Sequence, residues 1–294
     1  MNKSTMSSRT KGIIYIIFSA FGFAMMSAFV KLAGDLPSFQ KTFFRNLVSC
    51  FVALIFIIKN KESFFGKREN QKILITRSAL GTLGIVFNFY TIDKLVLSDA
   101  NMLNKLSPFF VIIFSALILK EKINLKQSIA IVIAFLGALF IIKPSFNLDI
   151  IPALIGVMGA LCAAGAYTCL RILGGKEKHY TVVFYFSFFS LIVIAPFMLA
   201  VYEPMSLKQL LYLILSGVFA TIGQFGITLA YKFAPSKEIS IFDYSNIIFS
   251  AIISLVVFGA LPDYLSVIGY IIIFGASFYM FMYNKKLDKL EKNK

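Results

Sequence analysis

Three ionisable side chains stand inside long apolar stretches of this sequence: Lys105, Asp243 and Arg45. A charge at the centre of a membrane helix costs about 2.5–3.5 kcal/mol on insertion scales, so such residues usually face the protein interior and take part in function. We expect Lys105, and with it Arg45, to bind an anionic group. Asp243 is expected to bind a cationic group or to take up and release a proton. A structural ion pair, or a side chain that snorkels to the surface, is the alternative for each.

Uncharged polar residues accompany these charges at helical spacing. Asn101, Asn104, Lys105 and Pro108 stand at i, i+3, i+4 and i+7, which is one face of a helix. A polar face inside lipid should point at the bundle interior or a watery space, because lipid cannot satisfy its hydrogen bonds. The expected substrate-binding residues are Lys105, Asp243, Arg45, Asn101, Asn104, Asn88, Gln224 and Asn246.

Other intramembrane residues have simpler interpretations. Pro108 interrupts the hydrogen bonds of its helix beside Lys105, whereas its repeat counterpart Asn246 does not break a helix. Arg77 lies about one turn inside its span, so we expect its side chain to snorkel to the surface. Small residues in the stripes mainly allow helices to approach closely, as expected for Gly81, Gly84, Gly156, Gly159 and Gly275.

The elements that must position these residues are transmembrane helices. The chain has 294 residues, 59% hydrophobic and only 15% charged, whereas soluble domains carry about 25% charged residues. A helix needs about 20 apolar residues to cross the bilayer. The predicted spans are 12–33, 39–58, 73–93, 97–119, 125–142, 150–171, 181–202, 208–231, 238–260 and 265–283.

The sequence repeats itself at a fixed offset: residues 98–140 resemble residues 236–278, which sets Lys105 on Asp243. We therefore predict two five-helix repeats, 12–142 and 150–283, followed by a charged tail, 284–294. Because each repeat crosses the membrane an odd number of times, the second must be inverted relative to the first. Inversion moves Lys105 and Asp243 toward opposite sides, so the two need not touch. Internal repeats in a membrane protein are typical of carriers.

The distribution of positive charge predicts the orientation. The net charge is +15; 21 Lys and Arg fall on the side of the N-terminus and 5 on the other side. Cytoplasmic loops carry the Lys and Arg excess, so both termini are expected in the cytoplasm of a plasma-membrane protein. This distribution argues against nucleic acid as the partner of the basic chain.

Several segments resemble the EamA-type transporters of the drug/metabolite transporter superfamily. They are LNKLSP at 103–108 leading to LKEK at 119–122, FRN at 44–46, and FGALPD at 258–263 with Gly269. Ala260 departs from the family, which commonly has Glu there. The resemblance covers about residues 12–283 and implies a ten-helix metabolite carrier with a central cavity.

We therefore expect an all-α membrane transporter that moves a small organic metabolite, such as an amino acid or a related zwitterion or anion, by alternating access. A lipid or lipid-linked metabolite flippase and a non-transporting scaffold are the alternatives. No enzyme activity, metal or cofactor is expected, because the chain has one histidine and no metal or phosphate-binding motif. The expected partners are the substrate and the bilayer. Proton coupling, the direction of transport and the oligomeric state stay open.

Overall fold

The computed structural model describes residues 8–120, 124–143, 150–173, 176–233 and 240–292, and their secondary structure is helical. Its α-helices are α1 (Ser8–Leu32), α2 (Ser38–Asn60), α3 (Gln71–Lys94), α4 (Leu97–Asn104), α5 (Ser107–Leu119), α6 (Leu125–Ile142), α7 (Ile151–Leu173), α8 (His179–Ala200), α9 (Leu207–Phe233), α11 (Ser245–Phe258) and α12 (Tyr264–Lys292). Two 3₁₀ turns, η1 (Arg68–Asn70) and η3 (Ser240–Tyr244), precede α3 and α11.

The predicted spans are recovered with changes at their ends. Within the described part of the chain, nine helical stretches are long and apolar enough to cross a membrane, and the tenth, Phe242–Phe258, is shorter. The predicted start of that span at 238 lies outside the described residues. The last helix continues to Lys292 instead of ending at 283, so much of the expected charged tail extends α12. The protein is an all-α membrane protein of ten spans.

Two of the spans are not single helices. The span predicted at 97–119 divides into α4 and α5, with Lys105 and Leu106 between them. Pro108 explains this break, because it lacks an N–H group and its ring excludes the carbonyl four residues earlier. In the second repeat the segment before α11 is a 3₁₀ turn. Asn246 itself lies in regular helix, as expected, and the 3₁₀ turn leads directly into it.

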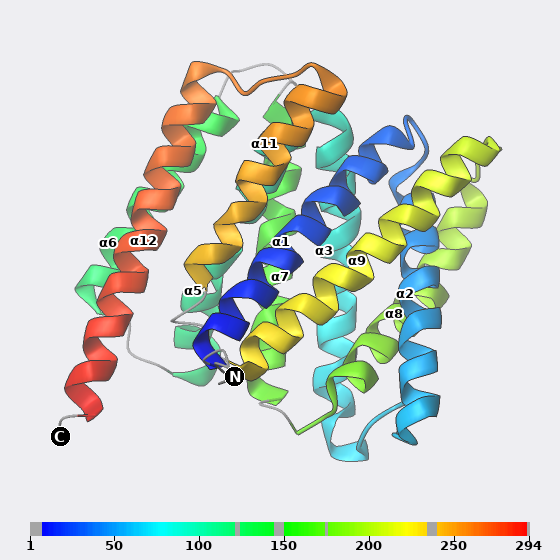
Figure 1. Ribbon diagram of the computed structural model, residues 1–294, viewed down its shortest axis with the longest axis horizontal. Coiled ribbons are helices and arrows are strands. Elements are labelled where there is room, and N and C mark those ends of the chain that lie inside the picture. The colour runs from blue at the N-terminus through cyan, green and yellow to red at the C-terminus, as the bar shows by residue number, and fades with distance from the viewer. Residues whose placement is uncertain (1–7, 121–123, 144–149, 174–175, 234–239, 293–294) are drawn as a thin grey trace, which may run out of the picture.

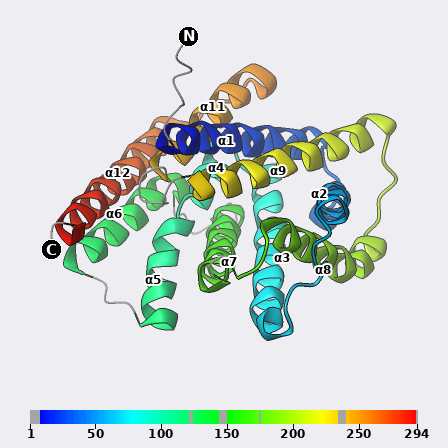
Figure 2. The same ribbon diagram turned by 60° about the horizontal axis from the view of Figure 1, so that its bottom comes forward.

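The helices pair as two inverted repeats would (Figures 1 and 2). Corresponding members contact each other at the two ends of the bundle, where α6 lies beside α12 and α2 lies beside α8. In the middle of the bundle, the first helix of each repeat packs on the third helix of the other repeat: α1 packs on α9, and α7 packs on α3. This set of contacts maps onto itself when the halves are exchanged, which is the mark of a two-fold relation.

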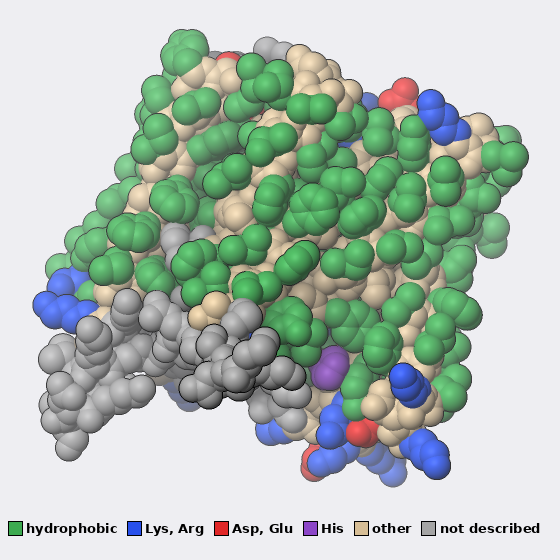
Figure 3. Space-filling model, viewed as in Figure 1, with side chains coloured by type: hydrophobic (Ala, Val, Ile, Leu, Met, Phe, Trp, Pro, Cys, Tyr) green, Lys and Arg blue, Asp and Glu red, His purple; other side chains and the backbone are tan. Residues whose placement is uncertain are grey.

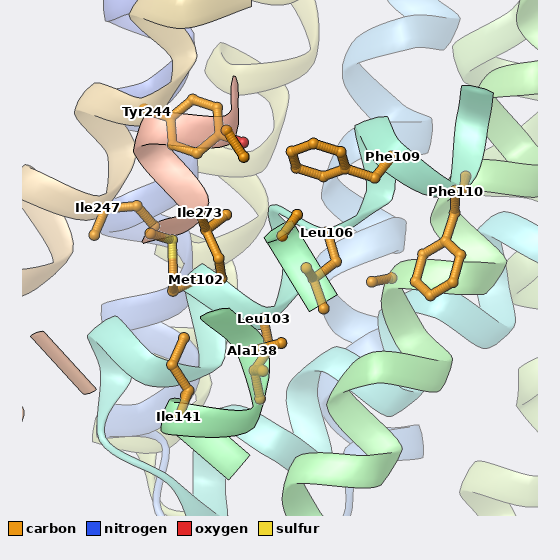
Figure 4. Packing of buried hydrophobic residues seen from close by; sticks show 14 of the residues in the cluster. Met102, Leu103, Leu106, Phe109, Phe110, Ala138, Ile141, Tyr244, Ile247 and Ile273 are labelled. Carbon is orange, nitrogen blue, oxygen red and sulfur yellow. The ribbon is translucent and has the colours of Figure 1, made fainter. Parts of the chain in front are cut away.

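A buried apolar cluster holds the broken segments together (Figure 4). Leu103 and Leu106 of the first break and Tyr244 and Ile247 of the second belong to it, together with Ile273 of α12. Their packing fixes the relative position of the two breaks, since interiors are close-packed and tolerate little displacement.

Glycines bring backbones close at several crossings. A Cβ atom added to Gly84 of α3 would lie 3.3 Å from the carbonyl oxygen of Gly159 in α7, and one on Gly269 of α12 would lie 2.6 Å from that of Gly137 in α6. Gly275, expected to be a packing position, would meet nothing within 4 Å among the described atoms. The packing role was therefore predicted wrongly for Gly275.

The surface suits a bilayer. Hydrophobic side chains cover most of the face in Figure 3, and the Lys and Arg side chains gather mainly at its lower edge, where α2 ends and α3 and α8 begin. Large apolar side chains that are exposed, such as Phe51 at 63% and Ile58 at 62%, are those that lipid would contact.

Candidate functional site

Lys105 and Asp243 form an ion pair where the two broken spans meet. Lys105 caps the C-terminus of α4, and its Nζ atom donates a hydrogen bond to Oδ2 of Asp243 in η3. The side chains keep 15% and 24% of their surface exposed, so protein encloses neither of them completely. The repeat offset predicted that Lys105 and Asp243 occupy equivalent positions in the two repeats. The structure adds that they touch, because both breaks lie beside the two-fold axis that relates the repeats.

Polar side chains around the ion pair hold the broken segments in place. The hydroxyl of Tyr244 donates to the backbone oxygen of Lys105 at 3.4 Å and also bonds to Ser277 of α12. This carbonyl lies at the end of α4, where it makes no regular helical bond because Phe109 N–H bonds to Leu106 instead. A tyrosine of the second repeat therefore provides the hydrogen bond that the backbone carbonyl lacks at the break in the first repeat.

Two of the predicted site residues take part in helix packing. The Nδ2 atom of Asn101 donates to Ser250 of α11 at 2.9 Å, while its Oδ1 atom accepts from Ser27 of α1 at 3.2 Å. Asn246 donates to the backbone oxygen of Ala20 in α1 at 2.9 Å. These bonds tie α4 and α11 to α1 and leave the amides committed to neighbours.

The other predicted amides lie in α4, α3 and α9. Asn104 is the last residue of α4 and is half-buried, Asn88 is buried in α3, and Gln224 is half-buried in α9. Among the side chains that the structure describes, no hydrogen bond joins Asn88 or Asn104 to Lys105 or Asp243. Their assignment to a substrate site stays a prediction.

Arg45 and Arg77 are buried together. Arg45 is 2% exposed and Arg77 is 6% exposed, and their guanidinium carbons lie 6.0 and 3.9 Å from the ring centre of Phe186 in α8. Arg45 donates through Nη1 to Asn46 at 2.5 Å, and Asn46 donates to Ser190 at 2.7 Å. Within the described part of the chain, neither arginine forms a salt bridge. The expectation that Arg77 snorkels was wrong, because Phe186 draws its guanidinium inward through a cation–π contact.

Sequence reasoning missed Arg77 as a member of this buried group. Arg77 lies four residues after the predicted start of its span at 73, close enough to that end to snorkel, so no pattern in the sequence indicates that its guanidinium turns inward.

Several charges at the end of the bundle away from the N-terminus have partners. Lys41 is buried and contacts Asp93 at 2.6 Å and the backbone oxygen of Gly34 at 2.5 Å. Lys31 donates to the carbonyls of Ile92 (3.0 Å) and Leu95 (2.5 Å) at the C-terminus of α3.

In the connections at this same end, Lys143 pairs with Asp263, and its hydrogen bond lowers the pKa of the Asp263 carboxyl below the ordinary value. These pairs join α1 to α3, α2 to α3, and the end of α6 to the start of α12. They hold this end of the bundle together.

Inverted repeats, interrupted helices and partly buried charges at the interruptions define this protein as a membrane transporter by architecture. The chain belongs to the EamA-like transporter family, whose model matches residues 10–143 and again residues 150–282. It is thus a multi-pass transporter of the drug/metabolite transporter superfamily, a class that acts on small molecules within a lipid bilayer.

Individual relatives support the assignment. The chain is 32% identical over 265 residues to the pseudopaline exporter CntI of Pseudomonas aeruginosa, covering 89% of this chain and 93% of that protein. It is 26% identical over 275 residues to solute carrier family 35 member G1 of Homo sapiens, covering 88% and 75%. A solved crystal structure resembles it in fold with a TM-score of 0.67 and 14% identity, covering 95% of this chain and 99% of the other.

Proposed function

We propose that this transporter carries a small organic metabolite with an anionic group, such as an amino acid or a related zwitterion, across the plasma membrane by alternating access. The observation that carries the proposal is the Lys105–Asp243 ion pair at the interrupted spans of the two repeats. Similarity to a protein named as an exporter supports outward transport. The excess of Lys and Arg on the N-terminal side supports cytoplasmic termini.

The ion pair is suited to exchange partners with a substrate. Breaking a buried pair by removing one partner is costly, because the other charge is left uncompensated. A zwitterion avoids this cost, since its carboxylate replaces Asp243 at Lys105 while its ammonium replaces Lys105 at Asp243. A substrate with anionic groups alone would leave Asp243 without a cation. Protonation of Asp243 would then release Lys105, which is the route by which transport would couple to protons.

The interruptions also suit alternating access. Lys105 lies between α4 and α5, and Asp243 lies in the turn before α11, so each charge is attached to a segment outside regular α-helix. Repeats that rock about a shared midpoint site keep such charges in place while the flanking helices open to one side and then the other. The paired charges around Lys41 and Asp93 would hold one end closed during half of this cycle.

A lipid or lipid-linked flippase is the second candidate, and one surface feature favours it. An apolar pocket between α1 and α11 is lined by Ile14, Ile17, Phe18, Phe21 and Phe249. Such a lining suits an acyl chain better than a polar metabolite. A non-transporting scaffold would need neither this pocket nor the buried charges.

A thermal-shift screen of the purified protein against a metabolite library tests the proposal, because a ligand raises the stability of the state that it binds. Metabolites that stabilise the wild-type protein are then tested for flux in proteoliposomes. Lys105→Ala should abolish the shift while the variant stays monodisperse in detergent. Lys126→Ala is the matched control, since Lys126 stands over Tyr283 near the start of α6. Wild-type affinity in Lys105→Ala, or stabilisation only by lipids, would contradict the proposal.

A further inference from the structure

Buried hydrogen-bond donors without partners cluster around Phe186. The Nε atoms of Arg45 and Arg77 and the Nη1 atom of Arg77 have no hydrogen-bond partner among the described residues. The two arginines come from α2 and α3 and converge on a ring from α8, three helices that contact one another. Gly81 allows this convergence, because a Cβ there would lie 2.9 Å from the Phe186 ring.

Hydroxyl groups without partners belong to the same three helices. They are the side chains of Thr42, Ser78, Thr82 and Ser187, each no more than 3% exposed. Thr42 stands three residues before Arg45 and so shares its helix face. Ser187 follows Phe186 directly. Guanidinium and hydroxyl donors that are buried with nothing to accept their hydrogen bonds indicate a place for an absent acceptor.

The charges around this place indicate that the acceptor is an anion. Asp243 balances Lys105, but Arg45 and Arg77 face no carboxylate in the described part of the chain, so the central charges carry an excess of two positive charges. An aromatic ring offsets only part of the cost of burying a guanidinium. The planar fork of arginine matches the two oxygens of a carboxylate.

We propose that Arg45 and Arg77 form a second anion-binding subsite, so that the substrate carries at least two separated carboxylates. One carboxylate binds Lys105, which faces Asp243, and the other binds the arginine pair at Phe186. This inference rests on the proposed function, in which Lys105 binds substrate, and it narrows the substrate class to organic acids with two or more carboxylates, with or without an amine.

Straight-chain dicarboxylates from malonate to azelate test the proposal, each compared with the monocarboxylate of equal length at matched ionic strength and constant chloride. Thermal unfolding of the purified full-length protein gives the concentration of each that is needed for a fixed stabilisation. For the wild type, at least one dicarboxylate should act at a tenfold or lower concentration than its monocarboxylate. Inorganic phosphate, run alongside, shows whether any compact dianion suffices; stabilisation by phosphate alone would overturn the two-carboxylate proposal.

Variants separate the subsite from the rest of the site. Arg77→Gln and Arg45→Gln should each lose the tenfold preference, whereas Lys126→Gln, which removes a positive charge at the start of α6, should keep it. Arg77→Lys keeps the charge but not the fork and should reduce the preference at least threefold; it serves where Arg77→Gln does not fold.

The outcomes also distinguish this subsite from the proposed function. If Lys105→Ala abolishes carboxylate binding while the arginine variants keep the preference, the second subsite is wrong and the proposed function stands. If the wild type shows no preference for dicarboxylates, the second subsite is wrong as well. If Lys105→Ala and the arginine variants all bind like the wild type, both proposals fail.

Discussion

Removing one partner of the Lys105–Asp243 ion pair should destabilise the protein more than removing both. A buried charge that loses its counter-ion costs about 3–5 kcal/mol. The two side chains keep 15% and 24% of their surface exposed, so protein encloses the remaining charge only in part. We therefore expect the lower end of that range, about 3 kcal/mol of unfolding free energy, for Lys105→Met and for Asp243→Asn alone.

The double variant Lys105→Met/Asp243→Asn leaves neither charge unpaired. Replacing both members of a buried pair by neutral groups of similar size is often close to neutral. The double variant should thus be more stable than either single variant, and the double-mutant cycle should give a coupling energy of at least about 2 kcal/mol.

The chain suits a thiol-reactive fluorogenic dye as the reporter of unfolding. Its three cysteines, Cys50, Cys162 and Cys169, are free and buried, and they react only when they become accessible. The control is the exposed pair Lys143–Asp263, whose loss should cost no more than about 1 kcal/mol. Additive losses in the cycle, or single variants as stable as the control, would refute the reasoning.

Three further outcomes are expected. Asp243→Asn should abolish uptake driven by an imposed pH gradient in proteoliposomes but keep gradient-free exchange of a substrate without an amine, which does not need Asp243 as a partner; wild-type uptake that ignores the gradient would exclude proton coupling. An impermeant thiol reagent should label Ser145→Cys but not Ser63→Cys on intact cells, and the reverse pattern would overturn the orientation. Gly269→Ala should lower the unfolding temperature because its new Cβ meets a carbonyl at 2.6 Å, whereas Gly275→Ala on the same helix should not; equal effects would contradict the packing.

The local composition of the chain was enough to predict most of its membrane spans. An apolar run of about 20 residues crosses a bilayer whatever its tertiary contacts, so the spans were predictable, and Pro108 placed one interruption. The 3₁₀ turn ending at Tyr244 was not predictable, because no proline marks it; its tyrosine is anchored by Ser277 and by the backbone of Lys105, which lie far away in sequence.

The sequence allowed the charged residues of the site to be predicted, but not which of them contact each other. A charge within an apolar span is unusual wherever it occurs, so Lys105, Asp243 and Arg45 stood out. Which charges contact each other depends on how the helices cross. The position of a residue along its span does not reveal those crossings. Arg77 lies close enough to its helix end to snorkel, yet it turns inward onto Phe186 of another helix. Whether a long side chain points to the membrane surface or to the protein interior is decided by its tertiary contacts.

The ion pair has a consequence for the ancestry of the chain. Residues at the same position of two repeats can touch only beside the axis that relates them, and Lys105 and Asp243 do so. In a symmetric dimer of one ancestral five-helix unit, the same position would bring two lysines or two aspartates together, and like charges disfavour each other. A positive and a negative charge can share the axis only after the two copies have become different genes or different halves of one gene. The fused, diverged chain thereby gained an asymmetry that no homodimer of its own half could possess.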